Sequence, residues 1–416
     1  MKKVAILHYA APPVVGGVES TIYHHARLLV KYGWGVDVLA GRGGSFHPKV
    51  TFHQIPEIDS RHPDVLSVGD ELASGYVSPA FQGLTGRLYD RIAAILGGCN
   101  VAIVHNAMTL HKNLAFTAAL SRISGEGLIP LIAWSHDFAW QDDLYTPDLH
   151  PGYPWDLLRT AWTGVAYVAV SAHRRERLAS LLDLPEGNIR VITPGVDPYE
   201  FLDLDPISVT LVERLNLLKA NPLVLLPARI TRRKNIQFAI RATAALKAQM
   251  PGVKLVITGP PGPHNPKNAV YLDSLKDLCI ELGVQEDVHF LYEQGEGDQP
   301  LHLPDKTIAA FFRLADALIF PSQSEGFGIP VLEAGLARLP VFAADIPPFR
   351  ESAGELAYFF DPQGDPAVVA GAMVDRLTAS QAYRLRRKVI DTFTWQAILE
   401  KDMLPLMVHV EGGQNT

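Results

Sequence analysis

Two glutamates flank a glycine-rich turn in the run Glu325-Gly326-Phe327-Gly328-Ile329-Pro330, which continues to Glu333. An apolar strand is predicted to end just before this run, and Pro330 favours the first turn of a helix. The N–H groups of residues 327–329 would then point, unpaired, out of a helix N-terminus, an arrangement that binds phosphate. One carboxylate could face a sugar beyond the phosphate while the other accepts hydrogen bonds from ribose hydroxyls. The alternative is a turn with two solvated glutamates.

A basic turn in the same half of the chain offers cations for such a phosphate. Arg229 is predicted to close a strand and Lys234 to open a helix, so both can converge on the carboxyl end of that strand. Arginine grips a diphosphate through two parallel hydrogen bonds, whereas lysine acts as a point charge. The neighbouring Arg232 and Arg233 are expected in solvent. Taken alone, this turn could be a surface loop, and its position opposite the predicted phosphate-binding helix favours a site.

Two loops in the first half also follow predicted strands. Gly16 and Gly17 lie in a proline- and glycine-rich loop before a helix, where glycine permits close approach of the backbone to a phosphate. The loop does not read G-x-G-x-x-G, and Asp37 lies within the second strand rather than at its end, so the fingerprint of NAD binding is missing. His136 follows another strand and could hold a substrate hydroxyl or a diphosphate oxygen.

Other polar residues are weaker candidates for the site. Gln141, Asp142 and Tyr145 are possible acceptor-side residues, and Asp203-Leu204-Asp205 resembles a metal-binding D-x-D but falls in a linker, where we expect it to be solvated. The basic stretch 173–177 is expected to be a surface face of a helix. The sequence contains no G-x-S-x-G elbow and no His-x-x-x-His motif, so it favours neither covalent hydrolase chemistry nor a metal centre.

Short apolar runs alternate with amphipathic stretches along the whole chain, which favours parallel sheets covered by helices on both faces. A helix is expected over Ser20–Tyr32. The strands predicted in the first half are Val4–Leu7, Val36–Ala40, Val101–His105, Leu128–Trp134, Val165–Val170 and Arg190–Thr193. The pattern then restarts after a boundary near 195–222. The strands predicted in the second half are Leu223–Pro227, Val253–Thr258, Val288–Tyr292, Ala317–Pro321, Leu339–Ala343 and Ala357–Phe360.

The composition narrows the classes of protein. The chain is 48% hydrophobic with a mean hydropathy of +0.09, which excludes disorder as its main state. Two cysteines exclude a disulfide scaffold and a zinc site built on clustered thiolates. The net charge of −7, shared by both halves, argues against a nucleic-acid partner and against docking on an anionic membrane, although a local basic patch would escape this count.

The sequence also bears on where the protein is found. The apolar run after Lys3 is too short for the core of a signal peptide. No uninterrupted apolar run reaches the roughly 18 residues of a membrane span. We therefore expect a soluble, cytoplasmic protein without a transmembrane segment, and leave peripheral membrane contact open.

These motifs together resemble the retaining glycosyltransferases of the GT-B fold, family four, also called group 1. The resemblance spans nearly the whole chain. The family's E-x7-E motif matches Glu325 and Glu333 with the internal Gly-Phe-Gly, and its Arg/Lys pair matches Arg229 and Lys234. Its N-terminal glycine loop matches Gly16-Gly17-Val18-Glu19. Also similar are the Val-Ser dipeptide before a helix and the Pro-Gly-Val-Asp run that ends the first domain, at residues 170–171 and 194–197.

The resemblance implies two Rossmann-like, doubly wound parallel-sheet domains that face a central cleft. Residues 1–200 would form the acceptor-binding domain, with a C-terminal helix at 395–416 packing back on it. Residues 201–394 would form the nucleotide-sugar-binding domain. The implied activity is transfer of a hexose, with retention of configuration, from a GDP-mannose or UDP-glucose type of donor to a hydroxyl on a small molecule or glycan. Neither a cofactor nor an obligatory metal is expected.

The resemblance also implies roles for single residues. Glu333 would bind the ribose and Glu325 the hydroxyls of the donor sugar. Arg229 and Lys234 would neutralise the departing diphosphate, and His136 would reach the transferred sugar. The remaining donor-binding residues would lie in three places. They are the two glycines of the first loop, a glycine that follows a strand of the second half, and the backbone of the turn between Glu325 and Glu333: Gly16, Gly17, Gly259, Phe327, Gly328 and Ile329.

Two features depart from the family or stay open. Arg338 stands where the family has glycine, so a left-handed backbone conformation there would be more strained than with glycine. The loop Thr258–Pro266, which contains Gly259, is rich in proline and is either a rigid wall on the donor side or a connector. The alternatives to a transferase are a GT-B epimerase or phosphorylase, a nucleotide-sugar-binding protein without catalysis, and, weakest, an NAD oxidoreductase.

Overall fold

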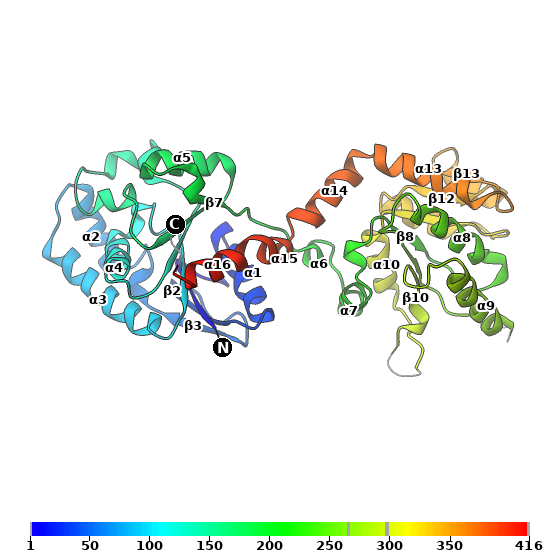
Figure 1. Cartoon of the computed structure of the whole chain (residues 1–416), viewed down its shortest axis with the longest axis horizontal. Coiled ribbons are helices and arrows are strands. Elements are labelled where there is room, and N and C mark those ends of the chain that lie inside the picture. Colours follow the sequence, from blue (N-terminus) through cyan, green and yellow to red (C-terminus); the bar gives the residue numbers. More distant parts are fainter. Residues whose placement is uncertain (1, 264–266, 296–298, 414–416) are drawn as a thin grey trace. The chain divides into compact units, whose positions relative to one another are not determined.

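The structure is a computed structural model that describes residues 2–263, 267–295 and 299–413. It divides into two compact units, Met1–Val196 with Phe393–Thr416 (unit 1) and Asp197–Thr392 (unit 2) (Figure 1). These bounds differ by a few residues from the expected 200/201 and 394/395. The reason is local, because the N–H of Val196 donates to Phe393 O over 2.9 Å and the N–H of Trp395 donates to Val196 O over 3.1 Å. Within the described ranges no helix is long and apolar enough to cross a membrane.

Unit 1 contains a parallel sheet of seven strands in the order β3-β2-β1-β4-β5-β6-β7. The strands are β1 Lys3–Ala10, β2 Gly35–Arg42, β3 Val50–Gln54, β4 Val101–His105, β5 Leu131–Ser135, β6 Val165–Ala169 and β7 Ile189–Val191. Six of them fall where apolar runs predict them. The edge strand β3 was not predicted, because only its first residue, Val50, is buried and no apolar run marks it.

Helices cover both faces of this sheet, and β1 shows how. Its residues alternate between the faces, so that Val4 and Ile6 join one core while Ala5 and Leu7 join the other. The first core contains one N-terminal helix and the C-terminal segment: α1 Gly17–Lys31, α15 Trp395–Ile398, a π turn Leu399–Met403 and α16 Leu404–Glu411. The second contains the helices α2 Pro63–Ala73, α3 Pro79–Leu96, α4 Leu114–Gly125 and α5 Ala172–Leu182.

Unit 2 repeats the architecture with a parallel sheet of six strands in the order β10-β9-β8-β11-β12-β13. The strands are β8 Leu223–Leu226, β9 Lys254–Ile257, β10 Val288–Phe290, β11 Ala317–Phe320, β12 Val341–Ala344 and β13 Tyr358–Phe360. The helices are α6 Pro198–Phe201, α7 Pro206–Arg214, α8 Ile236–Lys247, α9 Lys267–Glu281, α10 Asp305–Leu314, α11 Ile329–Leu336, α12 Pro347–Ala353, α13 Pro366–Ala379 and α14 Gln381–Thr392.

The strand orders confirm the predicted fold class of two doubly wound parallel-sheet domains. In unit 1 the chain builds outward from β1 to β3 and then starts again on the other side of β1 with β4. In unit 2 the same reversal separates β8 from β11. Such reversals leave a crevice outside the carboxyl ends of the two central strands, where open α/β sheets bind ligands. The predicted site residues should therefore lie at these two edges.

Candidate functional site

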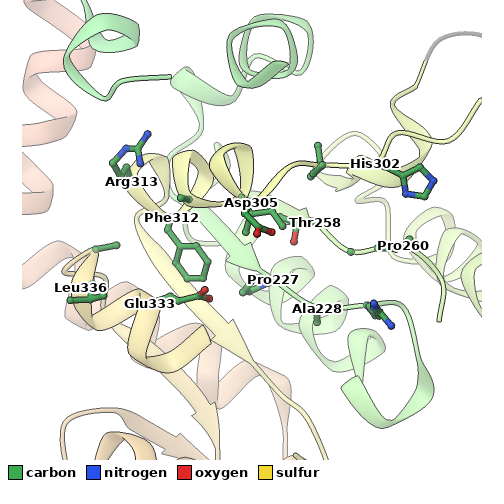
Figure 2. A pocket seen from close by; sticks show the side chains of 16 residues that line it. Pro227, Ala228, Thr258, Pro260, His302, Asp305, Phe312, Arg313, Glu333 and Leu336 are labelled. Carbon is green, nitrogen blue, oxygen red and sulfur yellow. The ribbon is translucent and has the colours of Figure 1, made fainter. Parts of the chain in front are cut away.

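Unit 2 has a cavity of about 810 Å³ at the carboxyl ends of β8 and β9. Its walls are the loops that follow these strands, together with α10 and α11 (Figure 2). Pockets of roughly 300–1,000 Å³ hold ligands of cofactor or drug size, so this volume suits a nucleotide. Three predicted site residues line it, namely Arg229, Gly259 and Glu333. The cavity lies beside the strand-order reversal of unit 2, as the fold requires of a ligand site.

Gly259 allows the two strand-end loops to touch through their backbones. A Cβ atom at this position would lie 2.3 Å from Ala228 O and 2.6 Å from the amide nitrogen of Arg229, far inside contact distance. Only glycine fits there without moving backbone. Of the proline-rich loop, Thr258, Gly259 and Pro260 line the cavity, which favours its interpretation as a donor-side wall. Residues 264–266 lie outside the described residues.

Arg229 presents an unpaired cation to this cavity. The prediction that it closes a strand is wrong by a short distance, because β8 ends at Leu226 and Arg229 follows in the loop. Its side chain is exposed and forms no hydrogen bond or ion pair with the residues that the structure describes. A guanidinium held by a fixed backbone and left without a partner is suited to a bidentate bond with phosphate.

Glu333 provides an unpaired carboxylate in the same cavity. It lies one turn into α11 and is exposed, and its carboxylate accepts no hydrogen bond from the described part of the chain. In Figure 2 its carboxylate points past the ring of Phe312, with Asp305 on the far side of that ring. A carboxylate is an acceptor only, so it suits a ligand that offers hydroxyl or N–H donors. Phe312, Asp305 and His302 line the cavity but were not singled out from the sequence, since nothing local marks them.

The predicted turn before α11 has the geometry of an anion site. Gly328 adopts φ 100, and a Cβ there would lie 2.7 Å from the ring of Phe349, so both conformation and packing require glycine. The N–H groups of Phe327, Gly328 and Ile329 donate to no group within the described ranges. These free donors sit at the positive end of the helix dipole. The turn does not itself line the cavity described above.

Lys234 and Glu325 form an ion pair with each other, which the sequence did not predict. Their side chains are only 12% and 9% exposed, and Glu325 also lies 3.7 Å from Nη1 of Arg233. The expectation that Lys234 opens a helix is wrong, since it ends a 3₁₀ turn and Asn235, at φ 52, separates it from α8. Arg232 and Arg233 are exposed, as expected. The pair brings the basic turn and the glycine turn together, and the N–H of Gln323 adds a 2.8 Å bond to Arg233 O.

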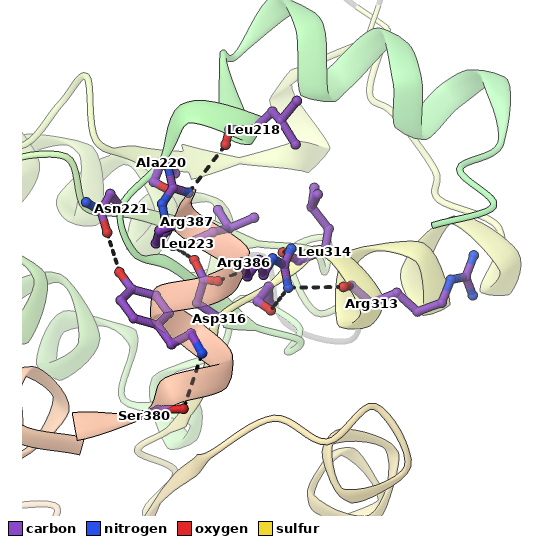
Figure 3. A network of polar contacts seen from close by, with 12 residues as sticks. Leu218, Ala220, Asn221, Leu223, Arg313, Leu314, Asp316, Ser380, Arg386 and Arg387 are labelled. Carbon is purple, nitrogen blue, oxygen red and sulfur yellow. Dashed lines mark hydrogen bonds and ion pairs between the residues drawn. The ribbon is translucent and has the colours of Figure 1, made fainter. Parts of the chain in front are cut away.

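A buried polar network joins α14 to the C-terminal end of α10 in unit 2 (Figure 3). Asp316 accepts a 2.8 Å bond from the N–H of Leu223 and lies 3.6 Å from Nε of Arg386. Arg386 in turn donates to Ala315 O over 3.1 Å, and Arg387 donates to Ala220 O over 2.6 Å. Burial raises the pKa of Asp316, and the two arginines oppose that shift. The network fixes the C-terminal end of the helix that lines the cavity.

His136 lies at the carboxyl edge of unit 1, immediately after β5. Its N–H donates to Asn106 Oδ1 over 2.8 Å, and its Nε2 lies 3.4 Å from Nδ1 of His105. Burial lowers the pKa of His136 to about 4, with the Asp137 carboxylate opposing and His8 and Arg174 adding to the shift. The ring is therefore neutral near pH 7 and can exchange a hydrogen bond with a ligand.

Three further histidines pack beside His136, and the sequence did not predict them as site residues. His8 lies on β1 and its Nδ1 is 2.9 Å from His105 O, while His105 ends β4. His25, on α1, contacts the His105 ring at a centroid distance of 5.7 Å, and neither of its ring nitrogens has a hydrogen-bond partner in the described structure. Burial lowers the pKa of His25 to about 3. The common feature of His8, His105 and His136 is a position near the carboxyl ends of three neighbouring strands.

The first glycine loop is open to a ligand. Gly16 has an extended backbone, and Gly17 begins α1, where a Cβ would meet nothing within 4 Å. No side chain of the described residues caps the N-terminus of this helix. Asp37, by contrast, is buried and paired with Lys3 Nζ at 2.7 Å. It is a structural carboxylate, which agrees with the missing NAD fingerprint.

The weaker candidates have mainly structural partners. Gln141 exchanges hydrogen bonds with Arg177, and Asp142 accepts one from the N–H of Leu144. Tyr145 contacts the ring of His111. The expectation that the D-x-D motif is solvated is wrong for Asp205, which caps α7 by accepting a 3.1 Å bond from the N–H of Ile207.

Two open parallel-sheet domains, with a glycine turn before a helix at the carboxyl edge of the second, are the architecture of GT-B glycosyltransferases. Residues 15–200 match the model of Glycosyltransferase Family 4, and residues 210–391 match that of Glycosyl transferases group 1. Together the two matches cover most of the chain, so the chain belongs to the family-four, group 1 glycosyltransferases.

Named proteins are similar to this chain at low identity. An uncharacterized glycosyltransferase of Methanocaldococcus jannaschii is 26% identical over 62% of this chain, and the chain spans 63% of that relative's length. A D-inositol 3-phosphate glycosyltransferase of Actinosynnema mirum is 25% identical over 83% of this chain and 81% of its own. The crystal structure of a glycosyltransferase from Rickettsia africae is 17% identical, covers 100% of this chain and 99% of its own, and has a TM-score of 0.39.

Proposed function

We propose that this glycosyltransferase is a retaining, metal-independent hexosyltransferase that uses a GDP-mannose or UDP-glucose type of donor and a hydroxyl acceptor. One observation above all supports the proposal. A cation and a carboxylate that both lack a partner among the described residues, Arg229 and Glu333, line a single cavity of about 810 Å³ in unit 2. A nucleoside diphosphate offers the complementary groups, an anionic diphosphate and ribose hydroxyls, at its two ends.

The donor would lie along this edge of unit 2. Glu333 would accept hydrogen bonds from the ribose, and Arg229 would bind the diphosphate, next to the Gly259 backbone. The free N–H groups of Phe327, Gly328 and Ile329 would complete the diphosphate site. The ion pair with Glu325 keeps the ammonium of Lys234 beside this turn, which supports its use as a second cation.

In the transfer step, an acceptor hydroxyl oxygen forms a bond to the anomeric carbon of the donor sugar. The bond from that carbon to the β-phosphate oxygen breaks, and the hydroxyl proton leaves with the nucleoside diphosphate. Positive charge and N–H donors that are already in place stabilise the departing diphosphate without reorganising in the reaction, which is worth roughly 2.7–4 kcal/mol per donor in enzymes of known energetics. Glu325 would bind hydroxyls of the donor sugar, and the roles expected for His136, Gly16 and Gly17 in unit 1 stay predictions.

Nucleotide binding tests the proposal directly. Thermal shift and calorimetry with GDP, UDP, GDP-mannose and UDP-glucose should show one preferred ligand, since a ligand at a hundred times its Kd stabilises the native state by about 2.7 kcal/mol. Arg229→Ala should lower turnover by roughly a hundredfold or more. The matched control is Arg232→Ala, an exposed arginine of the same turn that lies over the Tyr271 ring, and it should keep normal turnover.

Three results would count against the proposal in different ways. No binding of any nucleotide or nucleotide sugar would remove it. Tight binding without transfer or donor hydrolysis across many acceptors would indicate a binding protein, and dependence of turnover on inorganic phosphate would indicate a phosphorylase. A cytoplasmic location is part of the proposal, supported by two cysteines that are both free.

A further inference from the structure

A second cavity, of about 210 Å³, lies in unit 1 and has no part in the donor site. It is lined by α2, by Leu84 of α3 and by three segments that each follow the carboxyl end of a strand. Ser60 comes after β3, His111 and Lys112 come after β4, and Trp155 comes after β5. The helices α2, α3 and α4 form one group in Figure 1. The cavity therefore occupies the edge at which open parallel sheets bind ligands.

Two residues that line this cavity each carry a buried polar atom without a partner among the described residues. The side chain of Trp155 is 3% exposed, and its Nε1 donates to no acceptor in the described part of the chain. Nδ1 of His111 is also buried and has no hydrogen bond to a described residue. The two other indoles of the same segment are satisfied, because Trp140 donates to Trp155 O at 3.1 Å and Trp162 to Leu157 O at 3.0 Å. A ligand acceptor in the cavity would satisfy this N–H, since buried donors are rarely left unpaired.

The remaining groups at the cavity define what kind of ligand fits. The ammonium of Lys112 is exposed and forms no hydrogen bond or ion pair with described residues, and the carboxylates of Asp70 and Asp148 also line the space. Two carboxylates against one ammonium disfavour a phosphate or another anion. Donors and acceptors together suit hydroxyl groups, each of which can do both. The apolar walls are buried side chains of α2 and its neighbours, including Val68, Leu72 and Leu84.

The volume limits the ligand to one ring. A water molecule occupies about 30 Å³ of the liquid, so 210 Å³ has room for about seven waters. This is less than the roughly 300 Å³ at which pockets for drug-sized ligands begin. Apolar C–H faces bounded by hydroxyl groups are what a pyranose or a cyclitol presents.

We propose that this cavity binds one neutral, polyhydroxylated six-membered ring, and that this ring is the acceptor unit or its neighbour. The acceptor role rests on the proposed function, whereas the binding does not. Residues 106–113 connect the cavity to His136, since Asn106 Oδ1 accepts the His136 N–H and Thr109 Oγ1 donates to Asp137 O over 2.8 Å. A ring held at His111 and Lys112 would thus lie on the loop that contacts His136, the histidine expected at the transferred sugar.

The indole of Trp155 provides a local measurement of binding. The chain has six tryptophans, all in unit 1, and the ¹⁹F spectrum of the 5-fluorotryptophan protein can be assigned by single Trp→Phe changes. We expect the Trp155 signal to shift saturably with at least one of D-glucose, D-mannose and myo-inositol. Glycerol, a polyol without a ring, should not shift it. Trp34, which belongs to the core on the other face of the sheet, is the internal reference.

Two variants check that the shift comes from the cavity. Val68→Phe fills the space from α2 and should abolish the shift. Lys112→Gln changes an exposed side chain, leaves the fold intact, and should weaken binding roughly tenfold by removing a charged donor. In a transfer assay both changes should raise KM for the acceptor while KM for the nucleotide sugar stays the same. No saturable shift from any of the three rings, or an undiminished shift in both variants, would overturn the proposal.

The two proposals fail separately. If GDP and UDP sugars bind but no ring moves the Trp155 signal, the cavity assignment is wrong and the proposed function stands. If a ring moves the signal but no nucleotide binds, the proposed function is wrong and the cavity remains a sugar site.

Discussion

Replacing Gly259 by alanine should disrupt the donor cavity of unit 2. The added Cβ would lie 2.3 Å from Ala228 O, 2.5 Å from Ala228 C and 2.6 Å from the Arg229 amide nitrogen. Because all three atoms belong to the backbone, no side-chain rotation relieves the overlap, and the loops after β8 and β9 must move apart by about 1 Å. Overpacking of this kind costs roughly 1–3 kcal/mol. A displacement of about 1 Å at a catalytic group can cost a hundredfold in rate.

The assay combines stability with donor kinetics. For a domain of about 200 residues each kcal/mol lowers Tm by about 2–4 °C, so Gly259→Ala should melt about 2–12 °C lower by calorimetry or far-UV circular dichroism. Tryptophan fluorescence does not report on unit 2, which has no tryptophan. The matched control is Gly371→Ala within α13, where a Cβ meets nothing within 4 Å and helix propensity favours alanine by about 1 kcal/mol.

The kinetic result separates strain from loss of the site. Because the clash bears on the backbone of Arg229, we expect kcat to fall by one to two orders of magnitude along with the Tm. A Gly259→Ala protein with the wild-type Tm and unchanged kcat would refute the assignment of Gly259 as the contact that fixes Arg229. A lower Tm with unchanged kcat would show that the loops separate without moving the guanidinium.

Three further changes test other parts of the structure. Arg338 adopts φ 59 where the family has glycine, so Arg338→Gly should raise the unfolding free energy by about 0.5–1 kcal/mol, and a lower Tm would contradict this. Glu333→Gln keeps the shape of the side chain but not its charge, and should weaken nucleotide-sugar binding roughly tenfold by calorimetry; equal affinity would exclude a ribose contact. His25 is neutral in the native state with a pKa of about 3, whereas its unfolded pKa is near 6.5. Its contribution to the free energy of unfolding is therefore complete above pH 6.5. Below that pH the contribution declines by about 1.4 kcal/mol per pH unit down to pH 3, and His136 adds a similar slope down to its pKa of about 4. The urea midpoint of tryptophan fluorescence, which reports on unit 1, should fall between pH 7 and 5, and less steeply in His25→Phe.

Much of the fold was predictable because strands buried on both faces leave apolar runs in the sequence. β4 was placed at its observed bounds for this reason, whereas β3, at the edge with one buried residue, left no such run. The turn before α11 was also predictable, since its glycines and proline act locally.

Other parts of the site depend on contacts that no local pattern marks. The Lys234–Glu325 pair joins residues far apart in the sequence, and its two members were expected to face a ligand separately. His25 and His105 look like ordinary core positions until the strands β1, β4 and β5 are side by side. Phe312 and Asp305 enter the cavity because of where α10 packs, which only the folded chain determines.

The C-terminal segment has a consequence for synthesis on the ribosome. Ile398, Met403, Met407 and Val410 are buried in the same core as Val4 and Ile6, at the opposite end of the chain. Residues 2–196 therefore emerge without part of their core and must wait while residues 197–392 are translated, about 10–40 s at roughly 5–20 residues per second. During that interval the later unit can complete its own core while the earlier one still exposes the apolar surface of α1 and β4 that α15 and α16 cover. Nascent chains of this protein should thus present a defined binding surface for chaperones until the final helix appears.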